Sequence, residues 1–130
     1  MFATIKSLGL FGLNAFPVDV EVDIQKGLPH FDIVGLPDAA VKESRERIRA
    51  ALYSISVTLP PKHIVVNLAP ADVKKSGTMH DLAILVGVLK SMGQLSCSMQ
   101  GKFFIGEVSL SGEVRSVNGV LPMTILARSL

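Results

Sequence analysis

Five basic residues are the side chains of this sequence whose type and spacing best suit a chemical role. Three recur at intervals of three and four, and two adjoin each other further along the chain; they are Lys42, Arg45, Arg49, Lys74 and Lys75. Such intervals place side chains on one face of a helix, and clustered cations neutralise phosphate groups. The cluster predicts weak, sequence-independent contact with DNA. An ordinary solvated face and a contact with a partner subunit are the alternatives.

The other reactive side chains form no pattern typical of a nucleotide or metal site. The Gly-Lys dipeptide at residues 101–102 precedes a predicted strand, and Phe103 stands where a P-loop needs serine or threonine. His30, His63 and His80 are dispersed, whereas zinc ligands cluster at short spacing. We therefore expect no cofactor in this segment, neither ATP nor a metal ion, and no catalytic residue.

Three strands are predicted at the start of the chain, before the basic cluster. Residues 2–10 are rich in β-formers, residues 16–24 alternate apolar with acidic side chains, and residues 31–34 form a short apolar run. Alternation with period two indicates a strand with one buried face. We expect these three consecutive strands to pair as an antiparallel meander.

Two helices should position the basic residues. The first is predicted over residues 38–53, with Asp38 as its N-cap and an ion pair between Glu43 and Arg47 on its surface. The second is predicted over residues 79–92 and is apolar nearly all round, which indicates a central position. Lys74 and Lys75 lie in the loop before this second helix.

The remaining strands complete the predicted sheet. Residues 63–68 form a strand, and the consecutive Val65 and Val66 predict burial on both of its faces. Residues 103–110 and 113–117 flank a Ser-Gly hairpin signal. The pattern as a whole predicts an α+β fold of two layers, with mostly antiparallel strands and helices packed on one side.

Composition and length indicate one globular domain. The chain has 130 residues, of which 48% are hydrophobic and 18% charged, with a net charge of +2 and a single cysteine, Cys97. No signal peptide or membrane-spanning segment is recognisable, so we expect a cytoplasmic protein without membrane contact. A last helix is predicted to begin at Leu121 and has no end signal, so we expect the natural protein to continue.

Three long, ordered stretches carry a resemblance to a known family. They are GLPHFDIVGLPD at residues 27–38 with VKESRERIR at 41–49, VNLAPAD at 66–72, and GEVSLSGEVR at 106–115 with GVLP at 119–122. Together they resemble the magnesium chelatase-like AAA+ ATPases of the YifB/ComM type.

The resemblance implies a place for this chain in a larger motor. Residues 1–130 would be a single N-terminal accessory domain, serving ring assembly or substrate presentation, and an AAA+ ATPase module is expected beyond residue 130. That module would bind ATP and magnesium and form a homohexamer. Members of the ComM type are associated with branch migration of DNA, a helicase-type activity, during natural transformation.

The corresponding domain of that family is similar to the proteolytic domain of Lon, a two-layer α+β fold akin to a ribosomal-protein second domain. Lon-like peptidases use a serine activated by a lysine. By this resemblance the nucleophile position falls on Gly77, or on Ser76 or Thr78 if the match shifts by one residue. The lysine position falls on Leu121. Leucine cannot accept a proton, so the resemblance implies a non-catalytic domain. A Lon-like Ser-Lys peptidase and a stand-alone interaction module are the alternative functions.

Overall fold

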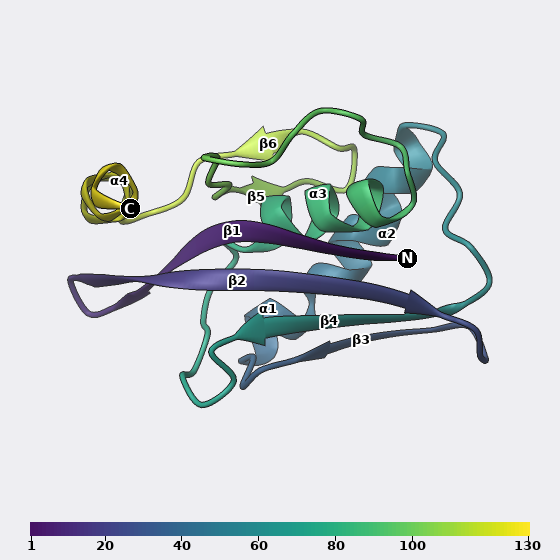
Figure 1. Ribbon diagram of the computed structural model, residues 1–130, viewed down its shortest axis with the longest axis horizontal. Helices are drawn as coiled ribbons and strands as arrows, with labels where there is room; N and C mark the ends of the chain where they lie inside the picture. Colours follow the sequence, from purple (N-terminus) through teal and green to yellow (C-terminus); the bar gives the residue numbers. More distant parts are fainter.

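The computed structural model describes all 130 residues and shows a curved sheet with helices packed against it (Figure 1). None of the helices is long and apolar enough to cross a lipid bilayer. In chain order the elements are β1 (Phe2–Phe11), β2 (Asn14–Gln25), β3 (His30–Val34), α1 (Ala39–Lys42), α2 (Ser44–Ser54), β4 (His63–Ala69), α3 (Asp81–Ser91), β5 (Glu107–Val108), β6 (Val114–Arg115) and α4 (Val120–Ser129).

The main sheet has four strands in the order β1-β2-β4-β3. β1 and β2 form an antiparallel hairpin, and β2 pairs antiparallel with β4. β3 runs parallel to β4, so the predicted meander of the first three strands is wrong. The connection from β3 to β4 contains α1 and α2, and a long helical crossover is what parallel neighbours require. β4 can therefore enter between β2 and β3.

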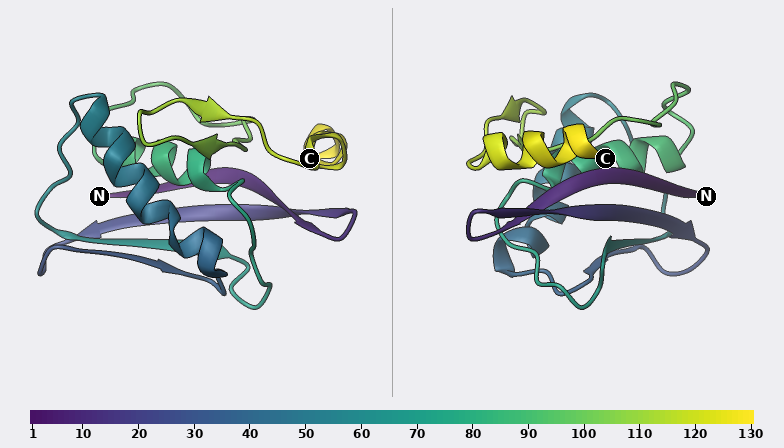
Figure 2. Two further views of the ribbon diagram at one scale, coloured as in Figure 1. Left: turned by 180° about the vertical axis from the view of Figure 1, so that it is seen from behind. Right: turned by 60° about the vertical axis from the view of Figure 1, so that its left-hand side comes forward.

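Only one face of the sheet is covered. α2 and α3 lie on the same side of it (Figure 2), where they bury the apolar side chains of β2 and β4. In β4, Ile64, Val66 and Leu68 are buried, while the residues between them are half-buried. The prediction that β4 is buried on both faces is wrong, because no helix covers the second face. The α+β class, with a mostly antiparallel sheet and helices on one side, is confirmed.

The predicted first helix is present but divided. Asp38 is its N-cap, as predicted, and its Oδ1 accepts a hydrogen bond from the amide of Val41 at 2.8 Å. α1 ends at Lys42 and α2 begins at Ser44, with Glu43 between them. α3 is the central helix, and its Gly87 lies so close to β2 that a Cβ there would be 2.7 Å from Cγ2 of Val22.

The last third of the chain departs most from the predicted strands. β5 and β6 pair over two residues each, because the segment before them pairs with β1 instead: the amide of Phe104 donates to the carbonyl of Lys6 at 2.9 Å. α4 begins at Val120, one residue before the predicted start, and packs against β1 and β2 (Figure 1).

Candidate functional site: a basic sheet edge and a pinned loop

The loop between β4 and α3 is held against the turn that leads into α1. The amide of Lys75 donates to the carbonyl of Leu36 at 3.0 Å, and the amide of Asp38 donates to the carbonyl of Lys75 at 2.9 Å. The amide of Gly77 also donates to Oδ2 of Asp38 at 3.3 Å. Asp38 therefore caps the helix and fixes the loop at once.

Lys75 points into the protein, which removes it from the predicted basic surface. Its side chain is fully buried, and its Nζ donates to the carbonyls of Gly35, at 2.9 Å, and Pro70. Burial lowers the pKa of the Lys75 ammonium below its ordinary value. Its neighbour Lys74 is exposed in the same loop. Because a buried ammonium cannot reach a phosphate, only Lys74 of this pair stays a candidate contact.

The positions that resemble a peptidase dyad lie on different parts of the fold. Ser76 is exposed in the loop after β4, and Gly77 beside it has a φ of +83°. Leu121 is 71% exposed on α4, which packs against β1 and β2. The nearest lysine in sequence, Lys75, has its amine hydrogen-bonded to two carbonyls. In this arrangement no basic side chain is hydrogen-bonded to the Ser76 hydroxyl.

A buried ion pair joins three elements at the start of α3. Asp81 is fully buried and accepts hydrogen bonds from the Ser44 hydroxyl at 2.5 Å, from Nε of Arg47 at 2.7 Å and from the amide of Val108 at 3.1 Å. The hydrogen bond to Asp81 raises the pKa of Arg47. The predicted pair between Glu43 and Arg47 is wrong, because Arg47 turns inward to this carboxylate.

One residue of the sequence pointed to this ion pair, although the apolar spacing of the helix around it drew no attention to it. Ser44 lies three residues after Val41 and four before Ile48, both of which are buried. A serine in an apolar helical stripe needs a buried polar partner, and the partner here is Asp81.

The three histidines occupy two different environments. His80 is buried, and desolvation lowers its pKa to about 4. His30 and His63 lie side by side on β3 and β4. Nε2 of His30 is 2.8 Å from Oδ1 of Asp32, and Nε2 of His63 is 2.8 Å from Oδ2 of the same carboxylate. The hydrogen bond from His63 holds the pKa of Asp32 below its usual range. Sequence reasoning missed this cluster, since only the pairing of β3 with β4 brings His63 to the other two residues.

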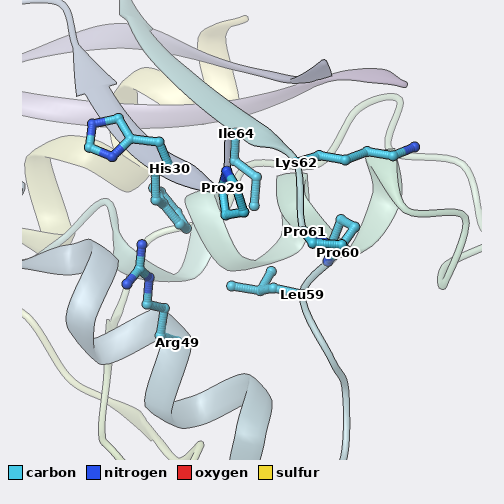
Figure 3. Close-up of a pocket in the computed structure, with 9 residues that line it drawn as sticks. Pro29, His30, Arg49, Leu59, Pro60, Pro61, Lys62 and Ile64 are labelled. Atoms are coloured by element: carbon cyan, nitrogen blue, oxygen red, sulfur yellow. The ribbon is translucent and has the colours of Figure 1, made fainter. Parts of the chain in front are cut away.

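The helical basic residues gather along β3, the edge strand of the sheet. Lys42, Arg45 and Arg49 line two pockets there, one of about 270 Å³ (Figure 3) and one of about 280 Å³. Lys62, which the sequence did not single out, lines the first pocket. We call these four residues the basic edge.

The guanidinium group of Arg49 is placed by an aromatic ring. It lies over the Phe31 ring, with Cζ 5.8 Å from the ring centroid. This geometry is that of a cation–π contact, which attracts the cation to the ring face. In Figure 3, Arg49 points from α2 toward β3.

Most of the basic edge carries uncompensated charge. No carboxylate lies within 4.0 Å of Lys42, Arg49 or Lys62, and Arg45 makes an exposed contact with Glu46 at 3.8 Å. Exposed ion pairs of this kind contribute little. The basic edge is therefore available to an anionic partner.

Comparison with known proteins places the chain among proteins of one family. Residues 20–130 match the model of the family described as subunit ChlI of Mg-chelatase. The chain is 41% identical over 127 residues to the competence protein ComM of Haemophilus influenzae, and 42% identical over 111 residues to the uncharacterized protein YifB of Escherichia coli K12. It is 38% identical over 123 residues to the uncharacterized protein Rv2897c of Mycobacterium tuberculosis.

These alignments cover 97%, 85% and 94% of this chain, but 25%, 22% and 24% of the three relatives. The chain thus spans about a quarter of the length of the curated relatives that it matches. Both the family match and the identities extend over most of its residues. The chain belongs to the magnesium chelatase-like family of ChlI, ComM and YifB.

Proposed function

We propose that this chain is the non-catalytic N-terminal domain of a magnesium chelatase-like AAA+ ATPase that acts on DNA. The observation that carries the proposal is the 41% identity to a relative named as a competence protein, of which the match covers only 25%. The rest of such a protein would hold the ATPase module, with its ATP and magnesium, and would assemble as a hexamer. This domain would assist ring assembly or present DNA to the motor.

The basic edge, with the loop residue Lys74, is the surface proposed to meet DNA. Lys42, Arg45, Arg49 and Lys74 all reach solvent, and the loop that carries Lys74 is hydrogen-bonded to the turn before α1. Contact through phosphates alone would be weak, with a dissociation constant on the order of 10⁻⁴ to 10⁻⁶ M. In a hexamer the effective concentration of six such surfaces would strengthen it.

Fluorescence anisotropy with duplex DNA across a salt series tests the DNA contact. If this surface neutralises about four phosphates, the slope of log affinity against log salt should be about −3.6. The double variant Arg45→Glu/Arg49→Glu should flatten that slope to about −1.8 and abolish binding at moderate salt.

The matched control is Lys102→Glu/Arg128→Glu, which changes net charge equally. Both residues are exposed and line pockets beside α4, away from β3. Equal loss of affinity in the two double variants would show that net charge alone, and not the basic edge, governs binding. Absence of binding at low salt would refute the DNA contact.

The peptidase alternative has one feature in its favour, a serine next to a lysine of lowered pKa. The lysine amine, however, is hydrogen-bonded to the carbonyls of Gly35 and Pro70, so Lys75 would have to leave a buried position before it could act as a base. A general base must reach its proton at hydrogen-bond distance. The geometry therefore favours the accessory role over the peptidase.

A further inference from the structure

β3 leaves one side of its backbone open. It ends the sheet and pairs only with β4, and no other element lies beyond it (Figure 1). The amide of His30 points inward, donating to the carbonyl of Lys62 at 3.4 Å. Because inward and outward residues alternate along a strand paired on one side, the amides of Phe31 and Ile33 point outward. Unpaired edge groups are a template for another strand.

Two pockets lie along this open edge at a spacing that suits an added strand. Phe31 and Arg49 line one pocket, and Ile33 lines the other together with Lys42 and Arg45. Phe31 and Ile33 are two residues apart, which is about 6.6 Å along a strand. Side chains on one face of an added strand recur at the same spacing, and pockets for alternate side chains give such additions their specificity.

The charge of the two pockets selects the side chains that would enter them. Each pocket carries at least one cation of the basic edge. Asp32 also lines the second pocket, but its two carboxylate oxygens lie 2.8 Å from His30 and from His63, and it forms no ion pair with the arginines or with Lys42. Carboxylates two residues apart would complement both pockets.

We propose that the outer edge of β3 binds an extended acidic segment of a partner protein as an additional strand, with carboxylates at alternate positions against Arg49 and against Lys42 and Arg45. The open backbone favours a polypeptide over a nucleic acid, because DNA offers no matching ladder of amide and carbonyl groups. This inference does not require the DNA contact proposed above. It uses the same cations, so peptide and DNA would compete for the basic edge.

Amide hydrogen exchange measured by NMR tests the added strand directly. The probe is a capped seven-residue peptide in which glutamate alternates with valine, and the control peptide replaces each glutamate with lysine. At saturation, exchange of the outward amides of Phe31 and Ile33 should slow by about tenfold or more. The lysine peptide should leave these two amides unchanged.

Variants and an oligonucleotide separate strand addition from charge attraction. Arg45→Gln/Arg49→Gln should weaken peptide affinity about five- to tenfold, given the usual strength of exposed ion pairs, whereas Lys102→Gln/Arg128→Gln should leave it unchanged. These are solvent-facing positions, and an unchanged amide spectrum shows that the variants fold. Oligothymidine should displace the peptide without slowing exchange of Phe31 and Ile33.

Three results would overturn the inference. They are peptide binding without protection of Phe31 and Ile33, equal affinity in the two double variants, and no peptide binding where DNA still binds. The last result would leave the DNA contact standing, so failure of this inference is distinguishable from failure of the proposed function. Protection by the peptide in a protein that does not bind DNA would support the added strand and refute the DNA contact.

Discussion

His80 is a residue whose protonation the fold opposes. Its side chain is 1% exposed at the start of α3, and desolvation lowers its pKa to about 4. The Ser7 hydroxyl, 3.4 Å from its Nδ1, donates its own hydrogen bond to the carbonyl of Phe104. His80 is therefore a neutral core residue at pH 7.

His80 should make stability depend on pH. Its pKa is lower in the folded state, about 4, than in the unfolded chain, about 6.5. The unfolded state thus binds more protons between these values, so stability is full above pH 6.5 and falls as pH drops toward 4. We expect urea unfolding to show about 2 kcal/mol less stability at pH 5 than at pH 7.5 from this residue.

The control for this prediction is His80→Gln, which cannot take up the proton. The variant is less stable at pH 7.5 because of altered packing, but its stability should change less between the two pH values. If wild type and variant lose the same free energy of unfolding, His80 is not the residue responsible.

Lys75 should contribute to folding and not to binding of anions. Replacing it in Lys75→Met keeps the length of the buried side chain but leaves the carbonyls of Gly35 and Pro70 without their donor. A buried acceptor left unsatisfied costs about 1–3 kcal/mol. Thermal and urea unfolding should show a loss in that range, whereas the adjacent, exposed Lys74→Met should change stability by less than about 0.5 kcal/mol.

At the scale of elements, the contact between Asp81 and Arg47 connects the start of α3 with α2 and β5. The side chain of Arg47 is 20% exposed and that of Asp81 is fully buried. If the contact is broken, water can therefore hydrate the two charged groups only poorly. Both helices cover the same face of the sheet (Figure 2). The ion pair thus fixes how the two helices lie relative to each other on that face.

Breaking this contact should be strongly destabilising. In Asp81→Asn the charge of Arg47 loses its partner inside the protein, and removal of one member of a buried pair costs about 3–5 kcal/mol. We expect urea unfolding to show a loss near the lower value, because Arg47 still reaches some solvent. Glu43→Gln is the matched control and should have little effect, since Glu43 is exposed and does not pair with Arg47. Similar losses in both variants would contradict the assignment of the partner.

At the scale of the whole molecule, we expect this chain alone to show neither ATPase nor peptidase activity. It contains no P-loop sequence, and Ser76 is not hydrogen-bonded to a basic side chain. Calorimetric titration with ATP and magnesium should show no micromolar binding, and an unfolded casein substrate should stay intact. Cleavage that Ser76→Ala abolishes would mean that Lys75, or another base, reaches the serine in solution.

The sequence alone determined those features that depend on local chemistry. Alternation of valine with acidic residues identified β2, the N-cap Asp38 identified the start of the first helix, and the apolar run after residue 79 identified α3 as central. The α+β class and the family followed as well, and both are confirmed. The side chains of Lys42, Arg45 and Arg49 also lie together in the structure, because helical periodicity fixes which side chains share a face.

Tertiary structure decided every feature that depends on a partner far along the chain. The order of strands depends on the crossover through α1 and α2, which lets β4 enter between β2 and β3. Lys74 and Lys75 are equivalent in sequence, yet only Lys75 is buried, because strand and loop pairing brings the carbonyls of Gly35 and Pro70 to its amine. Long-range contacts of this kind form only when the helices and strands pack together around the core. The local sequence of one segment is compatible with several packing partners, so it does not determine these contacts.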